Sequence, residues 1–322
     1  MPTSSRQQDW LSRLLDMITV KGRLEIRCSY GAPWQVAHED SEPGEMPYHI
    51  ILRGSAFLET PGMGAPRLLQ AGDVVLLLHG SQHRLHDGSG FTPLPANTRD
   101  ELNFSVSANA GTGDRLDMLC GRFVITPPHD RFIRDYLPGR LIVSTSNADQ
   151  TLNTDTAAQL TNLVALMRGE SSAQSLGGKA MLNALSAALF TLTLRLASES
   201  NDTPIGLLAM AGHPRLAPAL TAIFNDPAHP WTLPELAELC NMSRATLIRQ
   251  FQLKVGKSAN AVLTDVRMTM AANELASTTV STEVIADKVG YQSVAAFRRA
   301  FTQRMGMTPG DLRRSSHVEN ES

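Results

Sequence analysis

Two segments of this chain match each other at an offset of fifty positions, and this repeat limits the fold more than any other feature of the sequence. A short amphipathic segment and a tight turn precede the matching residues in each copy. The residues that recur are Ser243, Leu247, Arg249, Phe251 and Gly256, followed by Ser293, Phe297, Arg299, Phe301 and Gly306. The repeat predicts two copies of one unit built from a helix, a turn and a second helix.

The ends of the second helix in each copy carry local signals. Ser243 and Ser293 are expected as N-caps, because a serine hydroxyl can accept an otherwise unpaired backbone N–H. Gly256 and Gly306 are expected as left-handed C-caps. The helix-turn-helix units are predicted at 233–256 and 282–306, and residues 259–277 between them predict a long amphipathic helix.

The capped helices are expected to bury one side and expose another. In the first, Leu247, Phe251 and Val255 recur every four residues, and Phe297 with Phe301 repeat this stripe in the second. The opposite sides are small or cationic, and neither carries an acidic residue. Such a face fits a major groove, where arginine contacts guanine and an apolar side chain contacts a thymine methyl group. The alternative is an ordinary helical bundle with solvated arginines, which the duplication disfavours.

Charge and composition agree with a DNA-binding module at the C-terminal end. Residues 213–315 carry twelve Lys and Arg against eight Asp and Glu, whereas 1–212 carry seventeen against twenty-one. The chain has 322 residues, 42% of them hydrophobic, and a mean hydropathy of −0.13. Neither a secretory signal nor a membrane span is expected, so the prediction is a cytoplasmic protein without a membrane partner.

The region before the repeat has two different patterns. Residues 24–125 predict short strands with Gly and Pro turns, typical of a small β-barrel or sandwich, and 88–113 predict a mobile insertion. From about residue 151 the spacing becomes helical, and the apolar helix beginning near 178 is expected either deep in its own domain or at a partner surface, with dimerisation the preferred use. The predicted fold class is α+β, with a sensor domain at 1–145, linking helices at 146–205 and a DNA-binding domain at 213–315.

The second repeat unit closely resembles the AraC/XylS family of bacterial regulators. The matching positions are Ile285, Ala286, Val289, Gly290, Tyr291, Ser293, Phe297, Arg299, Phe301, Gly306, Thr308, Pro309 and Arg313, with Arg267, Ala271 and Leu275 in the linking helix. The chain departs from the family pattern at Ala259, where proline is usual, and at Val262 and Leu312, where tyrosines are common.

This resemblance implies that each second helix reads one of two successive major-groove segments. The positions that it implies for DNA binding are Arg244, Ala245, Ile248, Arg249, Val294, Ala295, Arg298 and Arg299. It also implies transcription activation, with double-stranded DNA and RNA polymerase as partners.

The N-terminal region resembles a cupin effector domain. Gly72 and Asp73, followed by Gly80 and His83, match the second cupin motif, with Leu78 in place of its usual proline. His49 stands where a histidine of the first motif is expected, but the paired histidines of a metal cupin are missing there. His49 and His83 are therefore weak metal candidates, and the prediction is no metal and no cofactor. The alternative is two histidines left in a β-barrel.

A looser resemblance links the chain to the reactive-chlorine-sensing subgroup of the family. It rests on the run at 11–15, on Cys28, on Trp34, Gln35 and His38, and on Cys120 with Gly121. The subgroup implies oxidant sensing by Cys28 and Cys120. The alternative is that both are inert buried thiols. Cys240, in the first helix of a helix-turn-helix unit, is expected in the core.

Reactivity needs a thiol that is partly ionised and accessible. Arg27 adjoins Cys28, but neighbours along a strand point to opposite faces, and only Arg122 is expected on the same face as its cysteine, Cys120. Sequence alone leaves open whether the two thiols meet.

The function predicted is a DNA-binding stress-response regulator, not an enzyme, controlled by its N-terminal domain through oxidation, with the signal passing through the helices of 151–200. Two rivals stay open. One is a regulator gated by a small ligand, with inert thiols. The other is a cupin enzyme with an auxiliary DNA module, which needs a constellation that His49 and His83 alone do not supply. The target promoter, the effector and a homodimeric state are left open.

Overall fold

A computed structural model describes residues 9–62, 64–145, 154–200 and 206–320. It contains two compact units. One combines 20–125 with 138–203, and we call it the β unit. The other combines 1–19, 126–137 and 204–322, and we call it the helical unit. Parts of the predicted linking region, 146–153 and 201–205, lie outside the described residues.

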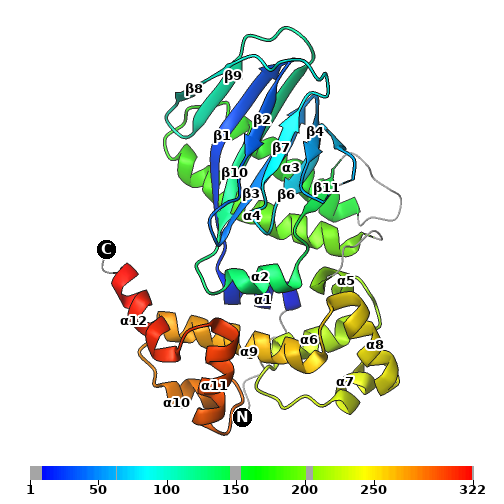
Figure 1. Ribbon diagram of the computed structural model, residues 1–322, viewed down its shortest axis with the longest axis vertical. Coiled ribbons are helices and arrows are strands. Elements are labelled where there is room, and N and C mark those ends of the chain that lie inside the picture. The colour runs from blue at the N-terminus through cyan, green and yellow to red at the C-terminus, as the bar shows by residue number, and fades with distance from the viewer. Residues whose placement is uncertain (1–8, 63, 146–153, 201–205, 321–322) are drawn as a thin grey trace. The chain divides into compact units, whose positions relative to one another are not determined.

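The β unit is built on two sheets (Figure 1). The seven-stranded sheet has the order β11 (Leu141–Ser144), β6 (Asp73–Leu76), β3 (Glu45–Arg53), β10 (Arg115–Val124), β1 (Lys21–Gly31), β9 (Ser105–Asn109) and β8 (Ala96–Asp100). The four-stranded sheet has the order β2 (Gln35–His38), β7 (His83–His86), β4 (Ser55–Glu59) and β5 (Arg67–Gln70). Side chains of both sheets form one apolar core that includes Cys28, Trp34, Leu58, Met118 and Cys120.

One expectation for this region is wrong in part. The predicted mobile insertion at 88–113 contains β8 and β9, which pair with each other, and β9 pairs in parallel with β1. Every residue of β8 is exposed, so its sequence lacks the apolar alternation by which a half-buried strand is recognised.

Two helices belong to the β unit, α3 (Thr154–Glu170) and α4 (Gly178–Glu199). They pack on each other, and α4 also packs on β1. α4 is long and apolar enough to span a membrane by length and composition alone, contrary to the sequence-based expectation. Half of that apolar stretch is buried in the β unit, including Leu182, Leu189 and Phe190. The breadth of its apolar surface is thus explained by packing within its own unit.

The helical unit contains the two predicted helix-turn-helix units, which are confirmed. The first consists of α7 (Leu233–Leu239) and α8 (Arg244–Val255), the second of α10 (Thr282–Lys288) and α11 (Val294–Met305). They are joined by α9 (Ala259–Ser277). The unit also contains α1 (Trp10–Ile18), α2 (Asp130–Tyr136), α5 (Leu207–Ala211), α6 (Ala217–Asn225) and α12 (Pro309–Asn320).

The predicted caps are present. The hydroxyl of Ser243 accepts a hydrogen bond from the Thr246 N–H, and Ser293 accepts one from Ala296. Gly256 and Gly306 end the same helices with φ of 74° and 75°, a backbone region that glycine enters without strain. The serine N-caps and the glycine C-caps therefore fix where both helices begin and end.

Candidate functional site

The outer faces of α8 and α11 are the first candidate site. Leu247 and Phe251 on α8, and Phe297 and Phe301 on α11, are fully buried and anchor the helices. The opposite faces are exposed at the positions that the sequence predicted, which are Arg244, Ala245, Ile248, Arg249, Ala295, Arg298 and Arg299, whereas Val294 is half-buried. Ile248 is 51% exposed, so its side chain is accessible for an apolar contact. The arrangement offers two small, cationic helix faces on one unit.

The outer faces of α8 and α11 differ in one contact. Arg298 of α11 forms an ion pair with Glu283 of α10, with the guanidinium nitrogen 3.2 Å from the carboxylate oxygen. Both side chains are more than half exposed, so solvent screens this pair. Within the described residues, Arg249 and Arg299 have no hydrogen-bonded or ionic partner, and their guanidinium groups are available to a ligand.

The linking helix is held by buried polar contacts. The Arg267 guanidinium donates to the carbonyl oxygens of Pro227, Ala228 and His229, and burial lowers the pKa of this group. This contact fixes the loop before the first helix-turn-helix unit to α9. At the positions that depart from the family pattern, Ala259, Val262 and Leu312 are buried, so the expected side chains are replaced by smaller or apolar core residues.

The second candidate site is the pair of thiols in the β unit. β1 and β10 are antiparallel neighbours, with Cys28 opposite Met118 and Ile26 opposite Cys120. The two cysteines are therefore diagonal partners on one face, and both lie in the core. Cys28 is 3% exposed and Cys120 5%. The strand pairing thus brings together two thiols that are far apart in the sequence.

The two thiols influence each other's ionisation. A hydrogen bond from Cys120 is the main cause that lowers the pKa of Cys28 below its ordinary value. The same hydrogen bond, followed by burial, raises the pKa of Cys120 well above it. Cys28 is accordingly the thiol that ionises more readily, and Cys120 is the one that keeps its proton.

The neighbouring arginines contribute little to this pair. Arg27 forms a two-point ion pair with Asp117, and Arg122 pairs with Glu25 and Glu45. Arg122 was expected on the same face as Cys120. Its positive charge is already neutralised by two carboxylates, so it contributes little to the ionisation of the Cys120 thiol.

A chain of hydrogen bonds connects Cys120 to two histidines. The distances are 3.1 Å from Cys120 Sγ to His49 Nδ1, 2.7 Å from His49 Nε2 to His83 Nε2, and 3.0 Å from His83 Nδ1 to the carbonyl oxygen of Ser81. Burial lowers the pKa of both imidazoles, which are neutral near pH 7. The sequence-predicted candidates His49 and His83 are thus brought into direct contact.

The direction of these hydrogen bonds follows from elementary donor rules. A carbonyl oxygen only accepts, so His83 Nδ1 carries the proton and its Nε2 has the lone pair. His49 Nε2 must then donate to His83, which leaves His49 Nδ1 as an acceptor for the single thiol proton of Cys120, the proton that Cys120 directs to Cys28 when Cys28 is ionised. Cys120 therefore has a neutral base beside it.

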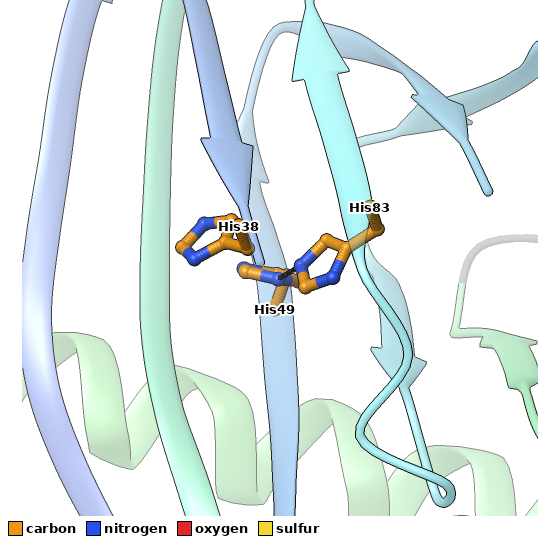
Figure 2. A group of neighbouring side chains, drawn as sticks. All are labelled: His38, His49 and His83. Carbon is orange, nitrogen blue, oxygen red and sulfur yellow. Dashed lines mark hydrogen bonds between the residues drawn. The ribbon is translucent and has the colours of Figure 1, made fainter. Parts of the chain in front are cut away.

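His38 completes this group, and the sequence analysis missed it as a site residue. It is directly opposite His83 in the pairing of β2 with β7, and the two rings stack with centroids 4.6 Å apart. Figure 2 shows the rings of His38, His49 and His83 gathered from three strands. Burial lowers the pKa of His38 to about 4. The spacing of these histidines in the sequence does not identify the group. His38 and His83 meet through strand pairing in one sheet, and His49 joins them because the two sheets face each other.

A cavity of about 450 Å³ leads to this cluster from the four-stranded sheet. His38 and His83 line it, together with Gln35, Glu39 and Arg84. The cavity gives a small ligand or an ion a route to two of the three rings.

Comparisons with known proteins cover both units. Residues 9–199 match the family model described as Cupin, and 236–315 match the model described as Helix-turn-helix domain. An uncharacterized HTH-type transcriptional regulator of Haemophilus influenzae is 31% identical, over 95% of this chain and 99% of that protein. The RCS-specific HTH-type transcriptional activator RclR of Escherichia coli is 30% identical, over 95% of this chain and 97% of that protein.

Two solved structures each cover about a third of this chain. A DNA-binding transcriptional dual regulator from Escherichia coli K-12 is 30% identical, covers 32% of this chain and 91% of that one, and has a TM-score of 0.30. The DNA-binding domain of AdpA in complex with a target DNA is 23% identical, covers 34% and 97%, and has a TM-score of 0.32. Together with the caps, the buried stripes and the two sheets, the family matches show that this chain belongs to the AraC-type helix-turn-helix transcriptional regulators with an N-terminal cupin domain.

Proposed function

We propose that this regulator is a transcription activator whose DNA binding is controlled by oxidation of Cys28 and Cys120. The observation that carries the proposal is the diagonal placement of the two thiols on one interior face of β1 and β10. The similarity to a relative named as an RCS-specific activator, over 95% of this chain, supports oxidants of the reactive-chlorine class, and hypochlorous acid is the probe chosen from it.

The oxidation proceeds in two balanced steps. The Cys28 sulfur, as thiolate, attacks the chlorine of hypochlorous acid, forms an S–Cl bond and releases hydroxide. The Cys120 sulfur then attacks Cys28, so that the S–S bond forms as the S–Cl bond breaks and chloride leaves. The Cys120 proton passes to His49 Nδ1, 3.1 Å away, and from there to hydroxide as water.

Forming this disulfide requires a change in strand geometry. Diagonal partners on neighbouring antiparallel strands lie about 7–8 Å apart. A disulfide needs Cα atoms within about 6.8 Å of each other. Oxidation therefore draws β1 and β10 together around Met118, which lies opposite Cys28.

The chain offers a direct covalent route for this change. α1 ends at Ile18 and β1 begins at Lys21, while β10 ends at Val124 and α2 begins at Asp130. Each cysteine-bearing strand thus runs within a few residues into a helix that packs in the helical unit. We propose that these two helices transmit the strand movement, in addition to the helices of 151–200.

Contacts inside the helical unit support this proposed route. Trp10 of α1 and Phe132 of α2 both pack edge-on against Phe224 of α6, with ring centroids 6.1 and 6.2 Å apart. The Tyr136 hydroxyl of α2 donates to the buried carboxylate of Asp265 in α9. A shift of either helix therefore acts on the helix that spaces the two reading units.

A second set of contacts connects α2 to the reading helix α11. Asp265 also lies 3.2 Å from an Arg304 guanidinium nitrogen, and Arg131 of α2 donates to the Arg304 carbonyl oxygen over 3.3 Å. Lys257, between α8 and α9, pairs with Asp135 of α2 at 2.6 Å. These polar contacts tie α2 to the C-terminal end of α11, where the helix meets its glycine cap.

The remaining parts of the proposal concern the DNA. We propose that Arg244, Ala245, Ile248, Arg249, Val294, Ala295, Arg298 and Arg299 face base edges in two successive major-groove segments. The supporting observations are the exposure of most of these side chains and the cationic character of both faces. The proposed sensor, linking and DNA-binding regions are 1–145, 146–205 and 213–315.

The proposed setting is the cytoplasm, where double-stranded DNA and RNA polymerase are the proposed partners and a homodimer is the proposed assembly. A regulatory function is favoured over catalysis because the relatives that span the chain are named transcriptional regulators.

The test uses the full chain and a duplex selected by it from a random pool. Thiol state by mass spectrometry and DNA affinity are measured on the same samples before and after hypochlorous acid. A Cys28–Cys120 disulfide with an affinity change of about 5- to 150-fold is expected. The change should vanish in Cys28→Ser and Cys120→Ser and persist in the control Cys240→Ala. An equal response in Cys28→Ser would overturn the redox proposal.

A second candidate function is gating by a small ligand, with inert thiols. It is favoured by the cavity of about 450 Å³ that His38 and His83 line. In that case the thiols stay reduced, and a compound that enters the cavity changes the DNA affinity of Cys28→Ser and the unaltered chain alike.

A further inference from the structure

The histidine cluster of the β unit has features that thiol oxidation does not use. One ligand nitrogen from each of His38, His49 and His83 lies within 4.8 Å of the others. His49 belongs to the seven-stranded sheet, and His38 and His83 belong to the four-stranded sheet. The rings therefore converge from both walls of the core, as Figure 2 shows.

Two ring nitrogens of the cluster are placed to bind a further partner. His38 Nε2 is buried and makes no hydrogen bond among the described residues. A buried polar atom without a partner is costly, so one that persists in a cluster of like groups calls for an explanation. His83 Nε2 has its lone pair directed into the cluster, because its Nδ1 proton is bound to the Ser81 carbonyl oxygen.

The hydrogen bonds on the far side of His49 and His83 resemble those that orient metal-binding imidazoles in proteins. A ligating histidine usually donates its other N–H to a carbonyl oxygen or a similar acceptor, and this fixes the ring. His83 has this arrangement through Ser81, and His49 is held by Cys120 on its far side, 3.1 Å from Nδ1. Burial also keeps all three rings neutral, which is the form that binds a cation.

We propose that His38, His49 and His83 form a three-histidine site for a divalent transition-metal ion, open to solvent through the cavity beside them. Three imidazole nitrogens suit Zn²⁺, Fe²⁺, Co²⁺ or Ni²⁺ rather than Mg²⁺ or Ca²⁺, which prefer oxygen ligands. His38 and His83 also line the cavity of about 450 Å³, so an ion has a path to the cluster and room for water or a small anion as a further ligand.

Occupation of the site has one chemical consequence for the protein. His49 Nε2 carries the proton that it donates to His83, so binding a cation at this nitrogen requires the other neutral tautomer, with the proton on Nδ1 beside Cys120 Sγ. Because only neutral imidazoles bind the ion, its uptake is expected to weaken with falling pH.

The test is titration of the chelator-treated full chain with Zn²⁺ and, separately, Co²⁺. We expect one ion per chain, with an affinity that falls more than about 100-fold in His38→Gln and in His83→Gln, since even loss of an outer support costs 10- to 100-fold. His86→Gln, on the same strand as His83 and outside the cluster, serves as the matched control and should bind as the unaltered chain does.

Two further measurements keep the proposal falsifiable. Circular dichroism and DNA binding confirm that each variant is folded, and the Co²⁺ absorption spectrum reports the donor atoms. Nitrogen-only bands that persist in Cys120→Ser are expected. A sulfur charge-transfer band that this variant removes would overturn the three-histidine site, as would unchanged affinity in His38→Gln or no uptake at all. These outcomes are independent of the hypochlorous acid response, so failure of one proposal leaves the other standing.

Discussion

The helical unit and the β unit place their candidate sites in opposite ways. The outer faces of α8 and α11 are exposed, and each is set by residues within one helix, from its serine cap to its glycine end. The thiol and histidine groups are buried, and each is assembled from strands distant in the sequence. The comparison teaches that a surface site can be fixed by local chemistry, whereas a core site depends on the whole pairing pattern.

The largest expected effect tests the anchoring of a reading face. Phe301→Ala removes a fully buried ring from the core of the second helix-turn-helix unit and should cost about 3–5 kcal/mol of unfolding free energy. Urea denaturation measures this loss. Leu253→Ala, at a side chain that is 66% exposed, is the control. A comparable loss in the control would contradict the assignment of buried and exposed faces.

The next effect concerns the buried histidines of the β unit. Burial lowers the pKa of His38 to about 4 and lowers the pKa of His49 and His83. Between pH 6.5 and 4 the unfolded chain therefore binds more protons than the folded one, so stability is present above pH 6.5 and is lost as pH falls.

The slope approaches about 1.4 kcal/mol per pH unit for each histidine that stays neutral. Denaturation in the presence of a chelator at several pH values measures it. His38→Gln should reduce the slope of the unfolding free energy against pH, while the neighbouring Arg122 and Cys120 stay in place. An unaltered slope would show that other groups control the acid sensitivity.

Removing one tyrosine hydroxyl in each unit tests whether the two units are stabilised independently. Tyr136→Phe removes the hydrogen bond to the buried Asp265 carboxylate inside the helical unit, and Tyr30→Phe removes the hydrogen bond to Ser107 inside the β unit. Each should cost about 1–3 kcal/mol. Hydrogen exchange should detect the first loss in α9 and the second in β9. Loss of protection in β9 on Tyr136→Phe would break the division into separate units.

The smallest effect tests how local the reading units are. Ser243→Ala and Ser293→Ala each remove one N-cap and should cost about 1 kcal/mol, as thermal unfolding reports. Threonine at either position should restore most of the loss, because it keeps the hydroxyl acceptor. No rescue by threonine would mean that the serines act through something other than capping.

These differences also explain what the sequence could predict. The caps at Ser243 and Ser293 and the stripes through Phe251 and Phe301 depend on neighbours three or four residues away, so they were predicted correctly. The meeting of Cys28 with Cys120 depends on the register of β1 and β10, which no local pattern fixes.

Two features lay beyond sequence reasoning for physical reasons. His38 joins the histidine cluster only because β2 pairs with β7 and the two sheets face each other. α1 and α2 belong to the stretch predicted as sensor domain, yet they pack in the helical unit, since their apolar faces are covered by α6 and α9. Both results depend on long-range packing.

The most direct test of DNA reading is a base-substitution matrix. Affinities of the unaltered chain, Arg249→Ala and Arg299→Ala are measured for every single-base change in the selected duplex. Each variant should lose about 1–3 kcal/mol of discrimination at one position, and the two positions should lie about one helical turn apart, near 10 base pairs. Uniform weakening across all sequences, or loss at the same position in both variants, would contradict the account of two helices in successive grooves.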